Sequence, residues 1–346
     1  MRRTRLMALA CAALSIVALT AVAASQAKSS KPAAVNYKVG LVTDIGGLND
    51  RGFNHLAYVG LQRAAAQLGV QVKVLTSTGA NDYVPNLSSL AKDGYNLIIG
   101  VGFLQEQAIQ QVAKAFPNTK FAGVDMNAET DFQGGISKNF EGLIFAENEV
   151  GYEVGYLAGL EAKRLGKTAV SSVGGIPVPP VVRYIAGFQA GAKAAFPGVK
   201  TLNGYSQDFV AQDKCKNVAL SQLAQGSAVV FQVAGGCGLG ALDAAKEKGA
   251  WGIGVDADQY YVNNRVLTSA QKKVDVAVYT SILNQVKRNV FAGGSNLLFN
   301  AKNGGVGLGK INAGVPAAEV AKTKAVAWQV HQGKVMVPTT CANKGC

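Results

Sequence analysis

The sequence predicts an α/β protein made of two doubly wound parallel-sheet lobes joined by a hinge. Strand-like and helix-like segments alternate from about residue 37 onward, which is typical of parallel sheets built from βαβ units. The alternation restarts near residue 168. Segments 97–125 and 229–256 also share one plan, an apolar strand, a glycine-containing turn, a helix and an apolar strand that ends in Gly-Val-Asp. We therefore expect two similar lobes that face each other across a cleft.

Apolar runs and helical periodicity place the individual elements. Strands are expected at 39–43, 70–75, 97–100, 120–124, 168–173, 200–205, 228–233 and 251–255, with helices between them and at 277–290 and 317–332. A helix at 148–164 carries Gly151, Gly155 and Gly159 at four-residue spacing, which allows close helix packing. We assign 36–147 plus about 268–295 to lobe 1, and 148–267 plus about 296–346 to lobe 2.

The first 27 residues differ from the rest. Arg2, Arg3 and Arg5 precede an apolar run that ends in small residues, the three-part pattern of a secretory signal peptide. The apolar run approaches the length of a membrane span, so an uncleaved anchor is the alternative. Cys11 lies too early for a convincing lipid-attachment site. We expect export, to a periplasm or to the outer face of the cytoplasmic membrane.

Charge and length exclude some classes of protein. The chain has 346 residues, is 49% hydrophobic and carries a formal net charge of +13, of which three arginines belong to the first 27 residues. The basic residues are scattered, with no stripe of interleaved aromatic residues, so no nucleic-acid site is indicated. We interpret the charge as surface solvation, and the protein as a monomer.

Four cysteines remain after residue 27, and they permit three pairings. Cys341 and Cys346 would close a short loop as a local pair, which leaves Cys215 with Cys237. A metal site is the alternative, but neither histidine lies near a cysteine in the sequence. We expect two disulfides, no metal and no cofactor.

The chain is organised around residues 39–54. A buried strand is followed there by a polar, glycine-rich turn and the start of a helix, and the turn includes Asp44, Asn49 and Asp50. Ligands of open α/β sheets bind at such turns, beyond the carboxyl ends of the strands. If the strand ends of both lobes line one cleft, that cleft contains Asp44, Asp50, Asp125 and Asp256.

Grouped carboxylates fit either a cation or the hydroxyl groups of a neutral ligand. The alternative is that each aspartate caps the helix that follows it. Phe53 and Phe209 are candidate walls for a planar ring, although core packing explains either one alone. Lys272 follows a segment that crosses between lobes and could reach the cleft, although a surface lysine is the default. Gly102, Gly235 and Gly236 would let the backbone approach a ligand.

These residues resemble the basic membrane protein (BMP) family of ABC-transporter substrate-binding proteins, of the purine nucleoside receptor A type. The motifs recur in order over residues 37–285: 39–54, Gly100-Val101-Gly102-Phe103, Phe121-Ala122-Gly123-Val124-Asp125, Gly155-Tyr156-Leu157-Ala158-Gly159, Gly187-Phe188-Gln189-Ala190-Gly191-Ala192, Gly254-Val255-Asp256-Ala257-Asp258-Gln259 and Leu267-Thr268-Ser269. The resemblance implies a type I periplasmic-binding fold. It also implies that Asp44 and Asn54 contact a base, Phe53 and Phe209 stack on it, and Asp125, Asp256 and Lys272 hold the ribose. The chain departs from the family at 207–210 and at Cys215 and Cys237.

We therefore predict a nucleoside-binding protein, and not an enzyme, that delivers its ligand to the membrane permease of an ABC importer. One alternative is a calcium-dependent nucleoside hydrolase, which also opens on a strand and clustered aspartates. Asn49 stands here where that family has an aspartate, which removes a charge that calcium favours. A sugar-binding protein of the same fold, or a sensory module, would fit the sequence as well.

Overall fold

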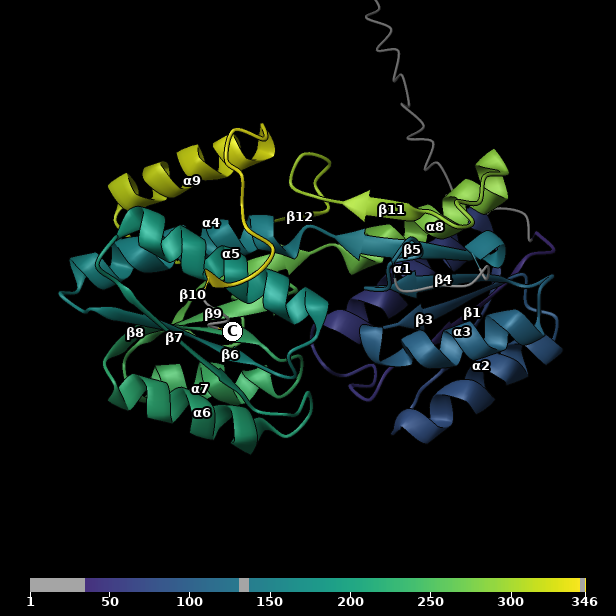
Figure 1. Cartoon of the computed structure of the whole chain (residues 1–346), viewed down its shortest axis with the longest axis horizontal. Coiled ribbons are helices and arrows are strands. Elements are labelled where there is room, and N and C mark those ends of the chain that lie inside the picture. The colour runs from purple at the N-terminus through teal and green to yellow at the C-terminus, as the bar shows by residue number, and fades with distance from the viewer. Residues whose placement is uncertain (1–34, 131–136, 343–345) are drawn as a thin grey trace, which may run out of the picture. The chain divides into compact units, whose positions relative to one another are not determined.

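The computed structural model describes residues 35–130, 137–342 and 346, which fold as one unit. The predicted signal peptide and Cys11 lie outside the described residues. Within this unit two sheets are each covered by helices on both faces (Figure 1). The predicted fold class, two doubly wound lobes, is therefore confirmed.

The first sheet consists of six parallel strands in the order β11-β5-β4-β3-β1-β2 among the described residues. The strands are β1 (Lys38–Val42), β2 (Gln71–Leu75), β3 (Leu97–Val101), β4 (Lys120–Val124), β5 (Phe140–Phe145) and β11 (Asn296–Phe299). The helices of this lobe are α1 (Phe53–Leu68), α2 (Tyr83–Lys92), α3 (Glu106–Ala115) and α8 (Val274–Arg288), with short 3-10 turns η1 (Ala80–Asp82), η2 (Phe103–Gln105) and η3 (Ser137–Asn139). Helices α1 and α8 pack together on one face, and α2 and α3 on the other (Figure 1).

The second sheet repeats this plan in the order β12-β10-β9-β8-β6-β7 in the described part of the chain, with only the edge strand β12 antiparallel. Its strands are β6 (Ala169–Gly174), β7 (Lys200–Tyr205), β8 (Ser227–Val233), β9 (Trp251–Asp256), β10 (Val266–Lys272) and β12 (Val306–Leu308). Helices α4 (Glu147–Arg164) and α5 (Pro179–Ala195) cover one face, and α6 (Gln212–Ala224) and α7 (Gly238–Glu247) the other, while α9 (Ala317–His331) packs on α4 (Figure 1).

The chain passes between the two sheets three times, after β5, after β10 and after β11. Strand β10 therefore belongs to the second sheet and β11 to the first. Our boundaries at about 268 and 296 placed each of these strands in the opposite lobe. The signal was weak because a strand that ends at a crossing has the same apolar pattern in either sheet.

Glycines bring α4 and α5 into backbone contact, as their spacing predicts. A Cβ added to Gly151, Gly155 or Gly159 would collide with the carbonyl oxygens of Tyr184, Phe188 and Ala192, which lie one turn apart on α5. Each substitution would force the helices apart, and much of the apolar core lies beneath this pair. The close contact fixes α5, and with it the side chains that α5 sends toward the strand ends.

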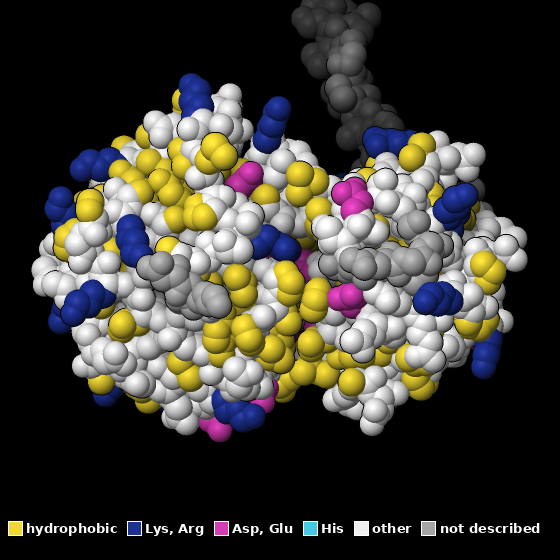
Figure 2. Space-filling model, viewed as in Figure 1, with side chains coloured by type: hydrophobic (Ala, Val, Ile, Leu, Met, Phe, Trp, Pro, Cys, Tyr) yellow, Lys and Arg dark blue, Asp and Glu magenta, His cyan; other side chains and the backbone are white. Residues whose placement is uncertain are grey.

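Two disulfides join Cys215 to Cys237 and Cys341 to Cys346, the pairs expected from the spacing. In the described residues, no helix combines the length and hydropathy needed to span a bilayer. Basic side chains are scattered over the visible face rather than gathered in a stripe (Figure 2).

Candidate functional site

A cavity of about 630 Å³, open solvent included, lies where the carboxyl ends of the strands of both sheets meet. Hydrophobic and acidic side chains meet in the middle of the visible face, between the two lobes (Figure 2). The cavity is lined by Asp44, Gly46, Asp50, Phe53, Asn54, Gly102, Phe103, Leu104, Asp125, Val178, Pro180, Val181, Tyr184, Phe209, Val233, Gly235, Gly236, Val255, Asp256 and Lys272. Eleven of the twelve predicted ligand-binding residues are in this set, drawn from segments more than 200 positions apart.

Asn49 is the exception. Its side chain is exposed and does not line the cavity. The next residue, Asp50, turns inward because its carboxylate accepts hydrogen bonds from the backbone N–H groups of Gly52 (3.0 Å), Asn54 (2.7 Å) and His55 (3.1 Å). These bonds fix the turn, and the neighbouring Asn49 side chain is exposed to solvent outside the cavity lining.

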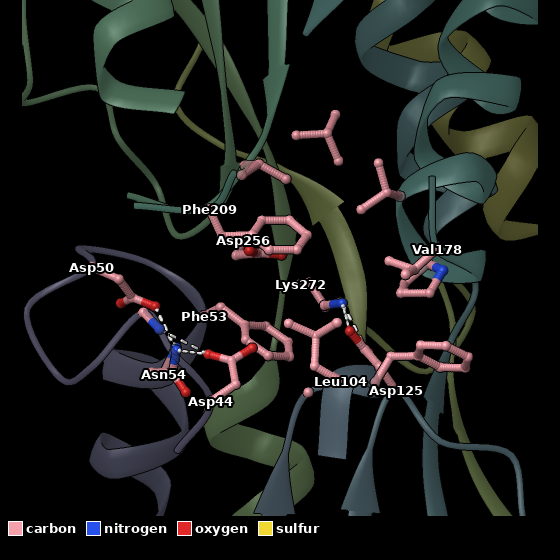
Figure 3. Close-up of a pocket in the computed structure, with 18 of the residues that line it drawn as sticks. Asp44, Asp50, Phe53, Asn54, Leu104, Asp125, Val178, Phe209, Asp256 and Lys272 are labelled. Carbon is pink, nitrogen blue, oxygen red and sulfur yellow. Dashed lines mark hydrogen bonds and ion pairs between the residues drawn. The ribbon is translucent and has the colours of Figure 1, made fainter. Parts of the chain in front are cut away.

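The first wall of the cavity is polar. Asp44 accepts hydrogen bonds through Oδ1 from Asn54 Nδ2 (2.7 Å) and from the Gly46 amide (3.1 Å), which leaves Oδ2 toward the cavity (Figure 3). Burial, more than any other cause, raises the pKa of Asp44 to about 6. Asp50 also lines the cavity, but both of its oxygens are occupied at the start of α1. Asp44 is therefore the acid of this turn with an oxygen available to a ligand.

Asp125 and Asp256 end corresponding strands of the two sheets. Both have left-handed backbones, with φ of 68° and 61°, a conformation in which aspartate is enriched among non-glycine residues. Each side chain is buried and faces the cavity (Figure 3). The sharp turn at each Gly-Val-Asp end therefore aims a carboxylate at the same space from opposite lobes.

Lys272, at the end of β10, reaches across to the first lobe. Its ammonium donates to both carboxylate oxygens of Asp125 (2.9 and 2.8 Å) and to Glu147 Oε1 (3.3 Å). Glu147 also accepts from Arg183 Nε at 2.6 Å. Burial by itself would lower the pKa of Lys272, but the surrounding carboxylates, chiefly Asp125, raise it above its usual value. The lysine therefore stays charged.

Two aromatic side chains complete the cavity from opposite lobes. Phe53 begins α1, and its ring centroid lies 4.9 Å from Lys272 Nζ. Phe209 comes from the loop between β7 and α6, and its ring occupies the space that a Cβ at Gly175 would fill. Gly102, with φ of 106°, makes room in the same way, because a Cβ there would lie 2.5 Å from Asp44 Oδ2.

Three partners of the site, two of them buried and Arg183 half-buried, were not expected from the sequence. Glu147, Arg183 and Tyr184 lie on long helices, where a charged or aromatic residue normally marks a surface or a core position. Tyr184 donates its hydroxyl to Asp256 Oδ1 at 3.2 Å. An apolar wall with Leu104 and Val178 was also not expected (Figure 3). Among the described residues, no group of three or more His, Cys, Asp or Glu side chains could hold a metal ion.

Two doubly wound lobes around a shared cavity are the architecture of two-lobed solute-binding proteins. The family described as "ABC transporter substrate-binding protein PnrA-like" (Bmp) matches residues 37–338. The chain is 33% identical to an ABC transporter nucleoside-binding protein, BmpA, of Lactococcus lactis, over 97% of this chain and 99% of the relative. It is 34% identical to an uncharacterized lipoprotein of Pyrococcus furiosus, over 82% of this chain and 73% of the relative. A solved solute-binding protein of an Aeropyrum pernix ABC transporter has a TM-score of 0.78 and 26% identity, covering 89% of this chain and 94% of that one.

The chain belongs to the Bmp family of PnrA-like ABC-transporter substrate-binding proteins. It is a substrate-binding protein of an ABC transporter and not an enzyme, so it binds a small molecule and works with membrane permease subunits.

Proposed function

We propose that the cavity binds a purine nucleoside, which the closed protein delivers to its permease outside the cytoplasm. The observation that carries this proposal is the combination of two aromatic rings and two matched carboxylates in one cavity, each pair drawn from both lobes. The nucleoside-binding relative BmpA supports the ligand class.

In this proposal Phe53 and Phe209 stack on the two faces of the base. Aromatic stacking on a nucleic-acid base contributes about 1–3 kcal/mol. Asp44 and Asn54 then contact the edge of the base. A carboxylate accepts hydrogen bonds, so Asp44 suits the ring N–H of hypoxanthine or guanine better than the bare ring nitrogen of adenine.

The ribose would lie against Asp125, Asp256 and Lys272. Carboxylates accept hydrogen bonds from neighbouring hydroxyl groups, and such charge-assisted bonds are strong and directional. Gly102, Gly235 and Gly236 allow the backbone close to the ligand. Closure of the lobes about the three crossing segments would enclose it, as in other hinged binding proteins.

Calorimetry with inosine, guanosine, adenosine, uridine, ribose and galactose tests the proposal. We expect inosine and guanosine to bind most tightly, and the two sugars not to bind at millimolar concentration. Phe209→Ala should weaken inosine binding by about tenfold or more, given the energy of one stacked ring. The control Phe116→Ala alters a phenylalanine at the end of α3 that does not line the cavity. Sugar binding without nucleoside binding would overturn the proposal.

A further inference from the structure

The Cys215–Cys237 disulfide lies directly behind the loop that carries Phe209. Cys215 is in the first turns of α6, and Cys237 immediately precedes α7. Both cysteines are fully buried, in an apolar cluster beneath these two helices. The disulfide therefore ties the helix that follows the Phe209 loop to the turn of Gly235 and Gly236, which also lines the cavity.

Backbone contacts connect this disulfide to Phe209. The amide of Cys237 donates to the carbonyl oxygen of Phe209 at 3.0 Å. Cβ atoms added to Gly235 and Gly236 would lie only 3.4 and 3.5 Å from that oxygen, so the turn and the loop pack backbone to backbone. Cys237 Sγ also lies 3.5 Å from the hydroxyl oxygen of Ser206, at the start of the loop.

The loop has few other anchors. The amides of Ser206 and Gln207 donate to the end of β6, and the Asp208 carboxylate accepts from the amides of Val210 and Ala211. The latter bonds are internal to the loop, although Lys214 of α6 also donates to Asp208 Oδ2 at 2.7 Å. Val210 is 51% exposed. Loops with few buried apolar contacts open locally at low cost in free energy. The hydrogen bond from the Cys237 amide is thus a backbone contact that Phe209 itself makes with the body of the lobe.

We propose that the Cys215–Cys237 disulfide is a positioning element for Phe209. By fixing α6 to the turn before α7, it holds the Phe209 carbonyl on the Cys237 amide and the ring at the cavity wall. Its effect on ligand affinity rests on the proposed nucleoside function, whereas its effect on the loop does not. Cys341–Cys346, by contrast, joins residues that do not line the cavity.

The test compares two double variants, Cys215→Ala/Cys237→Ala and the control Cys341→Ala/Cys346→Ala. Helices α6 and α7 stay packed without the disulfide, because Gly240 of α7 contacts the Gln212 backbone of α6. Hydrogen exchange is measured on the ligand-free proteins, and inosine affinity by calorimetry. We expect amides of 206–211 to exchange about tenfold faster in the first variant, and inosine affinity to fall about tenfold, as is usual for coupled neighbours. The control should change neither.

A second comparison separates positioning from general stability. In a Phe209→Leu background, removal of the same disulfide should change inosine affinity by less than about twofold, because the residue it positions no longer stacks. A full tenfold loss in that background would overturn the proposal. So would unchanged exchange in 206–211 without the disulfide.

Two further outcomes are also decisive. If the wild-type protein binds no nucleoside, the nucleoside function fails, and the exchange measurement alone decides the positioning role. If the alanine pair does not fold, Cys215→Val/Cys237→Ala restores apolar volume without the covalent bond. The same exchange and affinity results are then required of that variant.

Discussion

Asp125 and Asp256 occupy equivalent places in the two lobes. Each ends a parallel strand in Gly-Val-Asp, each has a left-handed backbone, and each is 7% exposed at the cavity. Their partners differ. Asp125 receives two hydrogen bonds from the Lys272 ammonium, whereas Asp256 receives one from the neutral hydroxyl of Tyr184.

The two otherwise equivalent carboxylates therefore have different hydrogen-bond donors, one charged and one neutral. Burial raises the pKa of Asp125, and the adjacent ammonium of Lys272 opposes that rise. Burial raises the pKa of Asp256 to about 7, with only a more distant influence from Lys272. The repeated motif therefore determines where each carboxylate lies, and side chains from unrelated elements determine which groups donate hydrogen bonds to it.

Among the variants that test this comparison, Lys272→Met should have the largest effect on the free energy of unfolding. It would leave the Asp125 and Glu147 carboxylates buried with their shared cation removed. Removing one partner of a buried ion pair typically destabilises a protein by roughly 3–5 kcal/mol. Urea denaturation at pH 7 measures this loss. Lys273→Met, at the adjacent half-buried position, is the control. A loss below about 1 kcal/mol, the usual worth of an exposed pair, would contradict the role of Lys272 as a buried counter-ion.

The sequence carries enough information for the fold and for most of the cavity. Alternating strands and helices predict parallel sheets. The repeated Gly-Val-Asp ends place Asp125 and Asp256 at the carboxyl edges of their sheets. An acidic residue directly after a buried apolar strand is unusual, because a core strand does not need one. That anomaly is what identified Asp44 and the matched aspartates.

Tyr184 and Glu147 could not be found in this way. Both lie on long helices, and their role depends on the crossing of α4 and α5, which sets the direction of each side chain. Asn49 lies outside the cavity lining although its polarity fits the turn, because the hydrogen bonds of Asp50 fix the turn with Asn49 exposed. Side-chain direction within a turn depends on bonds that a residue pattern does not specify.

The second-largest effect is expected in the pH dependence of the free energy of unfolding, to which Asp256 contributes. An unfolded aspartate has a pKa near 3.9, so between about pH 4 and pH 7 the folded protein holds a proton that the unfolded chain has lost. The contribution of Asp256 to stability is thus present at low pH and is lost as the pH rises to about 7. Linkage sets this loss at roughly 2–4 kcal/mol. Asp44 and Glu153, with pKa values raised to about 6 and about 8, act in the same direction.

Asp256→Asn should therefore lose less stability than the wild-type protein between pH 5 and pH 8, by roughly 2–3 kcal/mol, because part of the full loss falls below pH 5. Urea denaturation of the ligand-free protein at both values measures the difference. Asp243→Asn, on the exposed face of α7, should keep the wild-type slope. Equal slopes for Asp256→Asn and wild type would mean that Asp256 is already ionised at pH 5.

Tyr184→Phe should have the smallest effect on stability, and it should change the pKa of Asp256 alone of the two carboxylates. The substitution removes the hydroxyl that faces Asp256 Oδ1 at 3.2 Å and the Ala270 carbonyl oxygen at 3.4 Å, and it keeps the ring that packs edge-on against Phe231. Loss of one buried hydrogen bond costs about 1 kcal/mol. Because that bond favours the charged carboxylate, the pKa of Asp256 should rise further, while Asp125, which Lys272 holds, should titrate as before.

Carbon-13 NMR titration of the aspartate carboxyls measures the pKa values of Asp125 and Asp256 in one experiment. Tyr261→Phe, at a residue 63% exposed, is the control and should leave both titrations unchanged. A rise in the pKa of Asp125 equal to that of Asp256 in Tyr184→Phe would show that the two carboxylates titrate as one coupled pair. The contrast between the lobes would then be lost, because the ammonium of Lys272 would be shared by both carboxylates instead of fixing the charge of one.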